Sequence, residues 1–105
     1  MEIIPEPLYI CWSALMDFEY DPEISASNKD KHGIDFEEAQ ELWRDEDLLE
    51  VKARSDVEPR FFAVGRVAGI PWTDVCAFRN GRVRIISVRR SRKEEVEAYE
   101  ANLRS

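Results

Sequence analysis

Three stretches of the chain are predicted to be helices, from apolar residues at helical spacing or from residues typical of helix starts and ends. Asp21 followed by Pro22 is typical of a helix start, and Gly33 is typical of a helix end. A second helix is predicted from Asp35, because Glu38 three residues later completes a capping box. Apolar residues that should face the core follow at helical spacing, namely Phe36, Ala39, Leu42 and Trp43.

The third predicted helix closes the chain. Ser91 is its expected N-cap, with Glu94 completing a capping box. Its expected buried stripe is Val96, Tyr99 and Leu103.

Alternating and β-branched stretches predict strands between the helices. A short strand is expected at Asp17–Asp21 and an edge strand at Leu48–Val51, followed by three strands at Arg60–Val67, Trp72–Arg79 and Arg82–Arg90. Asn80-Gly81 is a strong signal for a two-residue hairpin turn, and Ala68–Pro71 is expected to be a four-residue turn. The predicted class is α+β, with two N-terminal helices, an antiparallel four-stranded sheet and a C-terminal helix.

The predicted register gathers arginines on one face of the sheet. A two-residue turn at Asn80-Gly81 pairs Arg79 with Arg82, Ala77 with Arg84 and Trp72 with Arg89, and the four-residue turn pairs Arg60 with Arg79. Alternation then gives one apolar face, which holds Phe61, Ala63, Cys76, Phe78, Val83 and Ile85, and one basic face, which holds Arg60, Arg79, Arg82 and Arg84. Arg89 is expected on the apolar face beside Asp74, as an ion pair or as a site residue.

Charge makes this cluster unusual. The chain has 105 residues, with 15 basic and 22 acidic side chains. Seven Lys or Arg and no acid lie between Arg79 and Lys93, so the remainder carries 8 basic against 22 acidic residues. Guanidinium forks suit phosphate, which favours a site for an anionic ligand. The alternative is a solvated face neutralised by acids such as Glu58, Glu94, Glu95 and Glu97.

Other classes of protein are disfavoured by the composition. The chain has no run of about 18 apolar residues, so no membrane span is expected. It has one histidine and two distant cysteines, Cys11 and Cys76, which predict neither a metal site nor a cofactor and suggest free thiols in a reducing cytoplasm.

Several groups of residues, in this order and spacing, resemble the BrnT toxin family. They are Phe18–Pro22, Asn28 with Lys31–Gly33, Phe36–Ala39, Arg60-Phe61 with Gly65, and Arg82–Arg90 followed by Glu95 and Tyr99. The resemblance implies a RelE-like fold and a ribonuclease toxin of a type II toxin–antitoxin pair. It further implies a BrnA-type antitoxin with a ribbon-helix-helix region, which would carry the pair to operator DNA, and it is compatible with a hetero-tetramer of two toxins and two antitoxins.

Members of this family usually begin near the Phe-Glu-Tyr-Asp-Pro motif. We therefore divide the chain into an extension at residues 1–16 and a single toxin domain at residues 17–105. Met16 directly precedes the domain, so the extension is expected to be a wrongly assigned start. The alternative is a real segment that packs through Tyr9, Trp12 and Leu15.

RNA can be cleaved without a metal when the 2′-OH attacks the adjacent phosphate, given a base, an acid and cations. The candidate catalytic residues are Lys31, His32, Glu58, Arg60, Arg84 and Arg89, and the candidate substrate-binding residues are Arg79, Arg82, Arg90 and Tyr99. His32 is the expected proton carrier. Against these roles, His32 and Lys31 could simply complement a helix C-terminus, Tyr99 could be core, and Arg90 could be solvated. A binding module without catalysis, or a structural protein whose arginines pair with its own acids, are the alternative functions.

Overall fold

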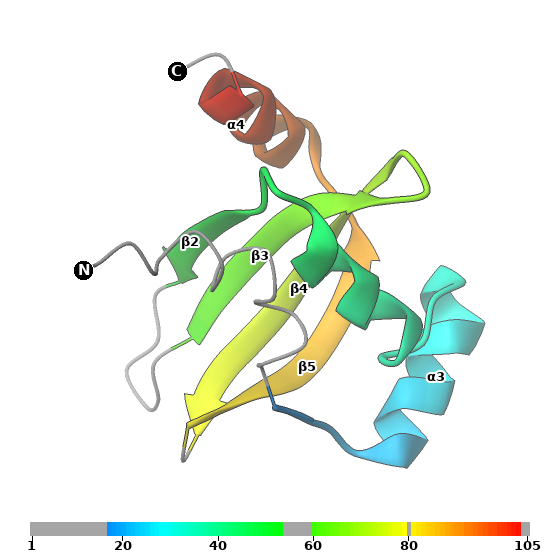
Figure 1. The fold of residues 1–105 in the computed structure, drawn as a ribbon. Helices are drawn as coiled ribbons and strands as arrows, with labels where there is room; N and C mark the ends of the chain where they lie inside the picture. Colours follow the sequence, from blue (N-terminus) through cyan, green and yellow to red (C-terminus); the bar gives the residue numbers. More distant parts are fainter. Residues whose placement is uncertain (1–16, 54–59, 80, 104–105) are drawn as a thin grey trace.

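A five-stranded sheet forms the centre of the computed structural model, which describes residues 17–53, 60–79 and 81–103 (Figure 1). The sheet order is β1-β5-β4-β3-β2. The elements along the chain are β1 (Phe18–Glu19), α3 (Pro22–His32), the 3₁₀ helix η1 (Glu38–Arg44), β2 (Leu49–Ala53), β3 (Arg60–Val67), β4 (Ile70–Arg79), β5 (Arg82–Arg90) and α4 (Lys93–Leu103). The mixed α+β class and the C-terminal helix are thus confirmed for the described part of the chain.

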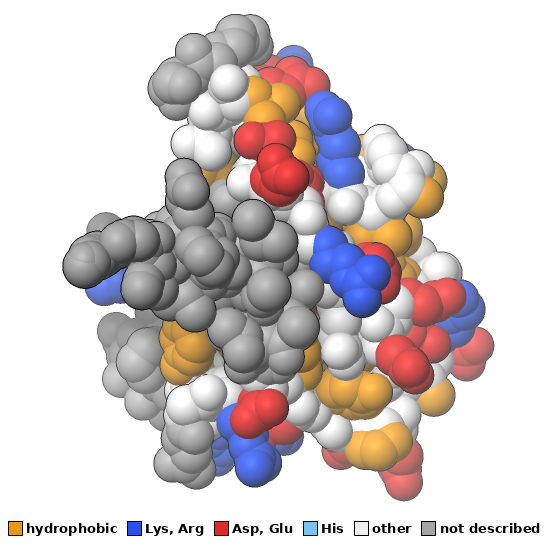
Figure 2. Space-filling model, in the orientation of Figure 1, with side chains coloured by type: hydrophobic (Ala, Val, Ile, Leu, Met, Phe, Trp, Pro, Cys, Tyr) orange, Lys and Arg blue, Asp and Glu red, His pale blue; other side chains and the backbone are white. Residues whose placement is uncertain are grey.

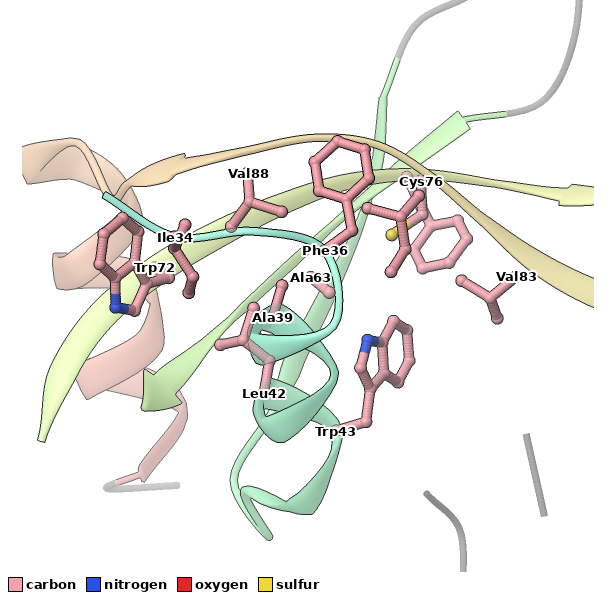
Figure 3. Packing of buried hydrophobic residues seen from close by; sticks show 12 residues of the cluster. Ile34, Phe36, Ala39, Leu42, Trp43, Ala63, Trp72, Cys76, Val83 and Val88 are labelled. Atoms are coloured by element: carbon pink, nitrogen blue, oxygen red, sulfur yellow. The ribbon is translucent and has the colours of Figure 1, made fainter. Parts of the chain in front are cut away.

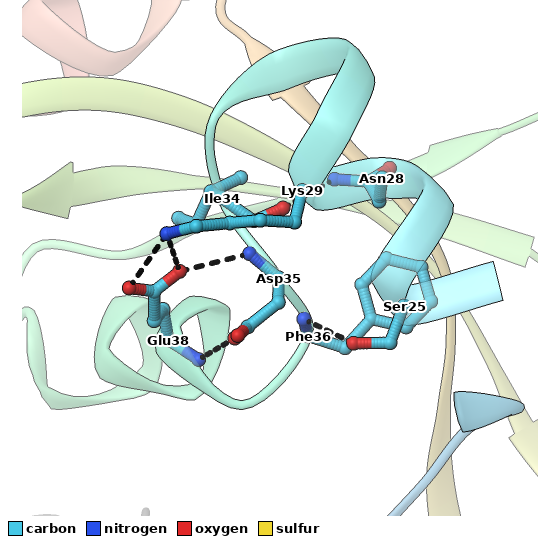
Figure 4. Close-up of polar contacts among 7 residues, drawn as sticks. All are labelled: Ser25, Asn28, Lys29, Ile34, Asp35, Phe36 and Glu38. Atoms are coloured by element: carbon cyan, nitrogen blue, oxygen red, sulfur yellow. Dashed lines mark hydrogen bonds and ion pairs between the residues drawn. The ribbon is translucent and has the colours of Figure 1, made fainter. Parts of the chain in front are cut away.

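The predicted strand count of the sheet is wrong. The sheet has a fifth strand, because β1 pairs in parallel with β5 and places Phe18 opposite Val83. The second predicted helix is present and is a 3₁₀ helix. Its N-terminal capping box is confirmed, since the Glu38 amide donates to Asp35 Oδ1 (2.7 Å) and the Asp35 amide donates to Glu38 Oε1 (3.0 Å) (Figure 4).

The core lies between η1 and one face of the sheet (Figure 3). The four apolar residues predicted from helical spacing are all at most 3% exposed, namely Phe36, Ala39, Leu42 and Trp43. Trp43 meets Phe61 edge-on with ring centroids 6.1 Å apart, and Phe18 packs beside it at 5.7 Å. The predicted apolar face of the sheet is therefore confirmed, although Phe78 at its end is 53% exposed.

Helix α3 is held against the sheet by polar side chains. Its predicted ends are confirmed, because Asp21 accepts from the Glu23 amide and Gly33 has a left-handed φ of 85°. Its buried residues are Ser25 and Asn28. The Asn28 amide group donates to the carbonyls of Val88 and Ile34 and accepts from the Val88 amide. Asn28 thereby provides hydrogen-bond partners for the backbone groups of Val88 on the edge of β5, beyond the point where β1 ends.

The turn between β3 and β4 has two residues, not four. Val67 pairs with Ile70, and the intervening Ala68 and Gly69 both have positive φ, 53° and 80°. A two-residue turn of this kind matches the twist of a hairpin, and Ala68 adopts it without the glycine or asparagine that would have signalled it. Arg60 therefore lies opposite Ala77 rather than opposite Arg79. The shift is two residues, so Arg60 keeps its predicted face.

A β-bulge changes the face of the second half of β5. Cys76 pairs with Ile85 but Val75 pairs with Ser87, so Ile86 is the extra residue. The predicted pairing of Trp72 with Arg89 is consequently wrong, because Arg89 lies opposite Thr73. Arg89 shares the face of Ala77 and Arg84, and the predicted ion pair with Asp74 does not form.

Helix α4 begins one residue later than predicted, at Lys93. Glu95, rather than Glu94, reaches back to the start of the helix and accepts from the Arg92 amide (2.7 Å). The Ser91 hydroxyl instead hydrogen-bonds with the Thr73 hydroxyl at 2.8 Å. Of the predicted stripe, Tyr99 is buried, Val96 is half-buried and Leu103 is 39% exposed, so polar contacts supply much of the attachment of α4.

Candidate active site

Four arginines meet on one face of the sheet, at the end beside Gly81. Arg60 and Arg84 lie opposite Ala77 from its two sides, and Arg79 lies opposite Arg82. Neighbouring strands are about 4.8 Å apart, so the backbones at Arg60 and Arg84 are about 10 Å apart. We call these four residues, Arg60, Arg79, Arg82 and Arg84, the arginine face. The predicted cluster is therefore present, with Arg60 displaced by two residues along β3.

Only some of the guanidiniums of the arginine face are paired with a carboxylate. Glu19 reaches Arg84 (Nη1–Oε2, 3.3 Å) and Arg82 (Nη1–Oε1, 3.9 Å), and its side chain is 27% exposed. Within the described residues, the exposed Arg60 and Arg79 have no ion pair or hydrogen bond from their side chains. Among the described residues, the arginine face therefore has two guanidiniums without a counter-ion beside two that share the carboxylate of Glu19.

The described residues visible in Figure 2 have mixed charge. In the view of Figure 2, Lys and Arg side chains lie mostly beside Asp and Glu side chains, with apolar patches between them. An ion pair outside the arginine face joins Lys29 to Glu38, with an Nζ–Oε1 distance of 2.8 Å (Figure 4).

Arg89 shares the basic side of the sheet but has its own counter-ion. It donates twice to Glu95 at 2.9 and 2.8 Å and lies 5.8 Å from the Phe62 ring centroid. Hydrogen bonding from Arg89 lowers the pKa of Glu95 to about 2, against the opposing effect of burial, and the Glu95 partner raises the pKa of Arg89 above its ordinary value. With a side chain only 18% exposed, Arg89 fixes α4 to the sheet.

Arg90 lies on the core side of the sheet, opposite Trp72. Its guanidinium lies 5.6 Å from the Trp72 ring centroid. The sheet therefore separates Arg90 from the arginine face. The structure does not bring Arg90 together with the other candidate substrate-binding arginines, Arg79 and Arg82.

Lys31 and His32 are exposed at the C-terminal end of α3. Asn28, one turn earlier, is bonded to Val88, which is four residues along β5 from Arg84 and hence about 13 Å away. Helix α3 runs beside β5 with its end toward α4 (Figure 1). The structure thus places the predicted proton carrier toward the other end of β5 from the arginine face.

Tyr99 is 3% exposed and donates its hydroxyl to Asp45 Oδ2 at 2.6 Å. Arg66 lies over its ring, 5.2 Å from the centroid. Burial, and then the bond to Asp45, raise the pKa of Tyr99 above its ordinary value. These contacts give Tyr99 a packing role that ties α4 to the end of η1. Glu58 lies outside the described residues.

Two acidic residues near the sheet have features that sequence reasoning missed. Glu19 joins the arginine face because β1 pairs with β5. The alternation at Asp17–Asp21 predicts the short strand but not the strand with which it pairs. Asp74 is fully buried on the core side and accepts from the Cys76 thiol at 3.1 Å. Burial raises the pKa of Asp74 to about 7, against smaller lowering effects of Cys76 and Trp43.

No three His, Cys, Asp or Glu side chains among residues 17–53, 60–79 and 81–103 are grouped so that they could hold a metal ion. None of the helices in those ranges is long and apolar enough to cross a membrane.

Comparison with known proteins assigns the family. The family described as "Ribonuclease toxin, BrnT, of type II toxin-antitoxin system" matches residues 20–95, which is well over half of the chain. No curated protein matches the chain. The matched region includes α3, η1, strands β2 to β5 and hence the arginine face. The chain therefore belongs to the BrnT family of ribonuclease toxins from type II toxin–antitoxin systems, whose members have a protein antitoxin as partner.

Proposed function

We propose that this protein is an endoribonuclease that cleaves RNA without a metal ion and binds the scissile phosphate on the arginine face. The observation that carries the proposal is the meeting of Arg60, Arg79 and Arg84 on one face, with the first two exposed and without a counter-ion in the described structure. A phosphate can take the place of the missing counter-ions through bidentate hydrogen bonds.

The chemistry requires stabilisation of negative charge. When the 2′-oxygen attacks phosphorus, charge builds on the non-bridging oxygens, and fixed cations there lower the barrier. Arg84 is the best placed, because Glu19, its partner on the neighbouring strand, holds its guanidinium while the side chain stays 34% exposed. Arg60 and Arg79 then bind the neighbouring phosphates, and Arg82 contributes from the start of β5. Lys31 and His32 are proposed to contact the RNA beyond the scissile bond.

From the resemblance to the BrnT family, we further propose a role for the protein in the cell. The domain at residues 17–105 has a RelE-like fold, and its activity stops growth by degrading RNA in the cytoplasm. A BrnA-type antitoxin with a ribbon-helix-helix region covers the arginine face and brings the pair to operator DNA, as a hetero-tetramer of two toxins and two antitoxins. The acidic remainder of the chain repels RNA elsewhere and directs it to the arginine face.

The protein, purified free of antitoxin, should cleave RNA in excess EDTA. The expected products carry 2′,3′-cyclic phosphate and 5′-hydroxyl ends, because the 2′-oxygen is the nucleophile. Product ends can be identified by mass spectrometry, with an RNA that carries 2′-deoxyribose at the cleaved position as the uncleaved control. Cleavage that stops in EDTA and returns with a divalent metal would contradict the proposal, and RNA that is bound but left intact would favour a binding module without catalysis.

A further inference from the structure

We propose that Glu19 is the general base, which takes the proton from the attacking 2′-OH. This inference rests on the proposed function, since it names a residue of that same site. A metal-independent cleavage needs a proton acceptor beside the scissile phosphate, and the arginines cannot serve because they keep their protons at any physiological pH.

Glu19 is placed by backbone pairing, not by a flexible loop. Its neighbour Phe18 is packed against Trp43, the Val83 amide donates to the Asp17 carbonyl at 2.8 Å, and Glu19 itself lies opposite Arg84. Its carboxylate reaches Arg84 and Arg82 at 3.3 and 3.9 Å, both loose for charge-assisted hydrogen bonds. A phosphate bound by Arg84 would therefore lie next to a partly exposed carboxylate that is not tightly engaged.

Four other candidate proton acceptors of the described structure are engaged or misplaced. Glu95 accepts two hydrogen bonds from Arg89 and one from Thr73, and Asp74 is buried on the opposite side of the sheet. The Tyr99 hydroxyl is engaged as a hydrogen-bond donor to Asp45. His32 lies toward the far end of β5. Glu19 is thus the one carboxylate in ion-pair contact with the arginine face among the residues that the structure describes.

The step balances without a co-reactant beyond water. The 2′-OH gives its proton to a Glu19 carboxylate oxygen while O2′ forms a bond to phosphorus. The P–O5′ bond breaks, its electron pair stays on O5′, and O5′ takes a proton from solvent water. The products are a 2′,3′-cyclic phosphate and a 5′-hydroxyl, and Glu19 returns its proton to solvent.

Glu19→Gln distinguishes a general base from a residue that only holds Arg84 in place. The amide oxygen of glutamine can still accept a hydrogen bond from Arg84, but it cannot take a proton at neutral pH. We expect Glu19→Gln to cleave RNA about 100-fold more slowly. It should bind an RNA with a 2′-deoxy cleavage position at least as tightly as the unchanged protein, because a negative charge beside the phosphate is gone. Glu19→Asp should keep part of the activity, and Glu23→Gln, an exposed neighbour on α3, is the matched control.

The separation of cleavage from binding provides a readout that a structural role would not give. Glu19→Gln should lose cleavage while it keeps its binding of the 2′-deoxy RNA, whereas a variant with a damaged fold should lose both. If Glu19→Gln cleaves RNA at the rate of the unchanged protein while Arg84→Met loses activity, the role of Glu19 is overturned and the arginine face remains the site. Wild-type cleavage by both variants would overturn the proposed function as well.

Discussion

Replacing Arg84 with Met should slow RNA cleavage by about 100- to 1,000-fold, the usual cost of removing one preorganised group that stabilises transition-state charge. Methionine keeps much of the apolar stem of arginine but has no charge. The pair with Glu19 is partly exposed, so the free energy of unfolding should change by less than about 1 kcal/mol. Initial cleavage rates and a thermal melt of each variant measure both effects.

Arg44→Met is the control for loss of charge. Arg44 lies on η1, on the other side of the sheet, with a highly exposed side chain and only a 3.7 Å contact to Glu41. We expect this variant to cleave like the unchanged protein. Equal slowing in Arg44→Met and Arg84→Met would mean that overall charge, not the arginine face, determines the rate.

The buried Asp74 should make the protein less stable as pH rises from about 4 to about 7. Its pKa is raised from 3.8 to about 7 in the folded protein, so over this range the folded state binds more protons than the unfolded state. The shift is about three pH units at 1.36 kcal/mol each, so ionisation of Asp74 should cost about 4 kcal/mol of unfolding free energy. Below about pH 4 the carboxyl is protonated in both states and this cost is absent.

Asp74→Asn isolates this effect, because asparagine cannot ionise but retains an oxygen that can accept from the Cys76 thiol. Urea unfolding at several pH values gives the difference in unfolding free energy between the unchanged protein and the variant. That difference should shift by about 3 kcal/mol in favour of the variant between pH 4 and pH 7, and by about 4 kcal/mol between pH 3 and pH 8. Asp30→Asn, at an exposed position on α3, should show no such shift. A constant difference for Asp74→Asn across this range would refute the assignment.

The parts of the site that the sequence predicts correctly depend on local signals. Asn80-Gly81 sets the pairing of Arg79 with Arg82 and of Ala77 with Arg84, because a two-residue turn leaves one register. The length of the preceding turn is less determined, since Ala68 takes a left-handed conformation that its residue type rarely adopts. Arg60 was therefore predicted on the correct face but opposite the wrong residue.

The incorrect or missing parts depend on tertiary contacts. The bulge at Ile86 has no glycine or proline to mark it, and it alone moves Arg89 from the core side to the side of Glu95. The contact of Glu19 with Arg84 spans 65 positions of the chain, so only the folded sheet brings the two together. Periodicity identifies the faces of single elements, whereas these contacts require the whole sheet.

The most direct test of the central claim is to observe which arginines RNA contacts. In NMR spectra of the guanidinium Nε–H groups, adding an RNA with 2′-deoxyribose at the cleavage position should shift the signals of Arg60, Arg79, Arg82 and Arg84. The signals of Arg44 and Arg66, which lie away from the arginine face, should stay in place. Shifts confined to other residues, with the four signals of the arginine face unchanged, would contradict the claim that this face is where the toxin binds RNA.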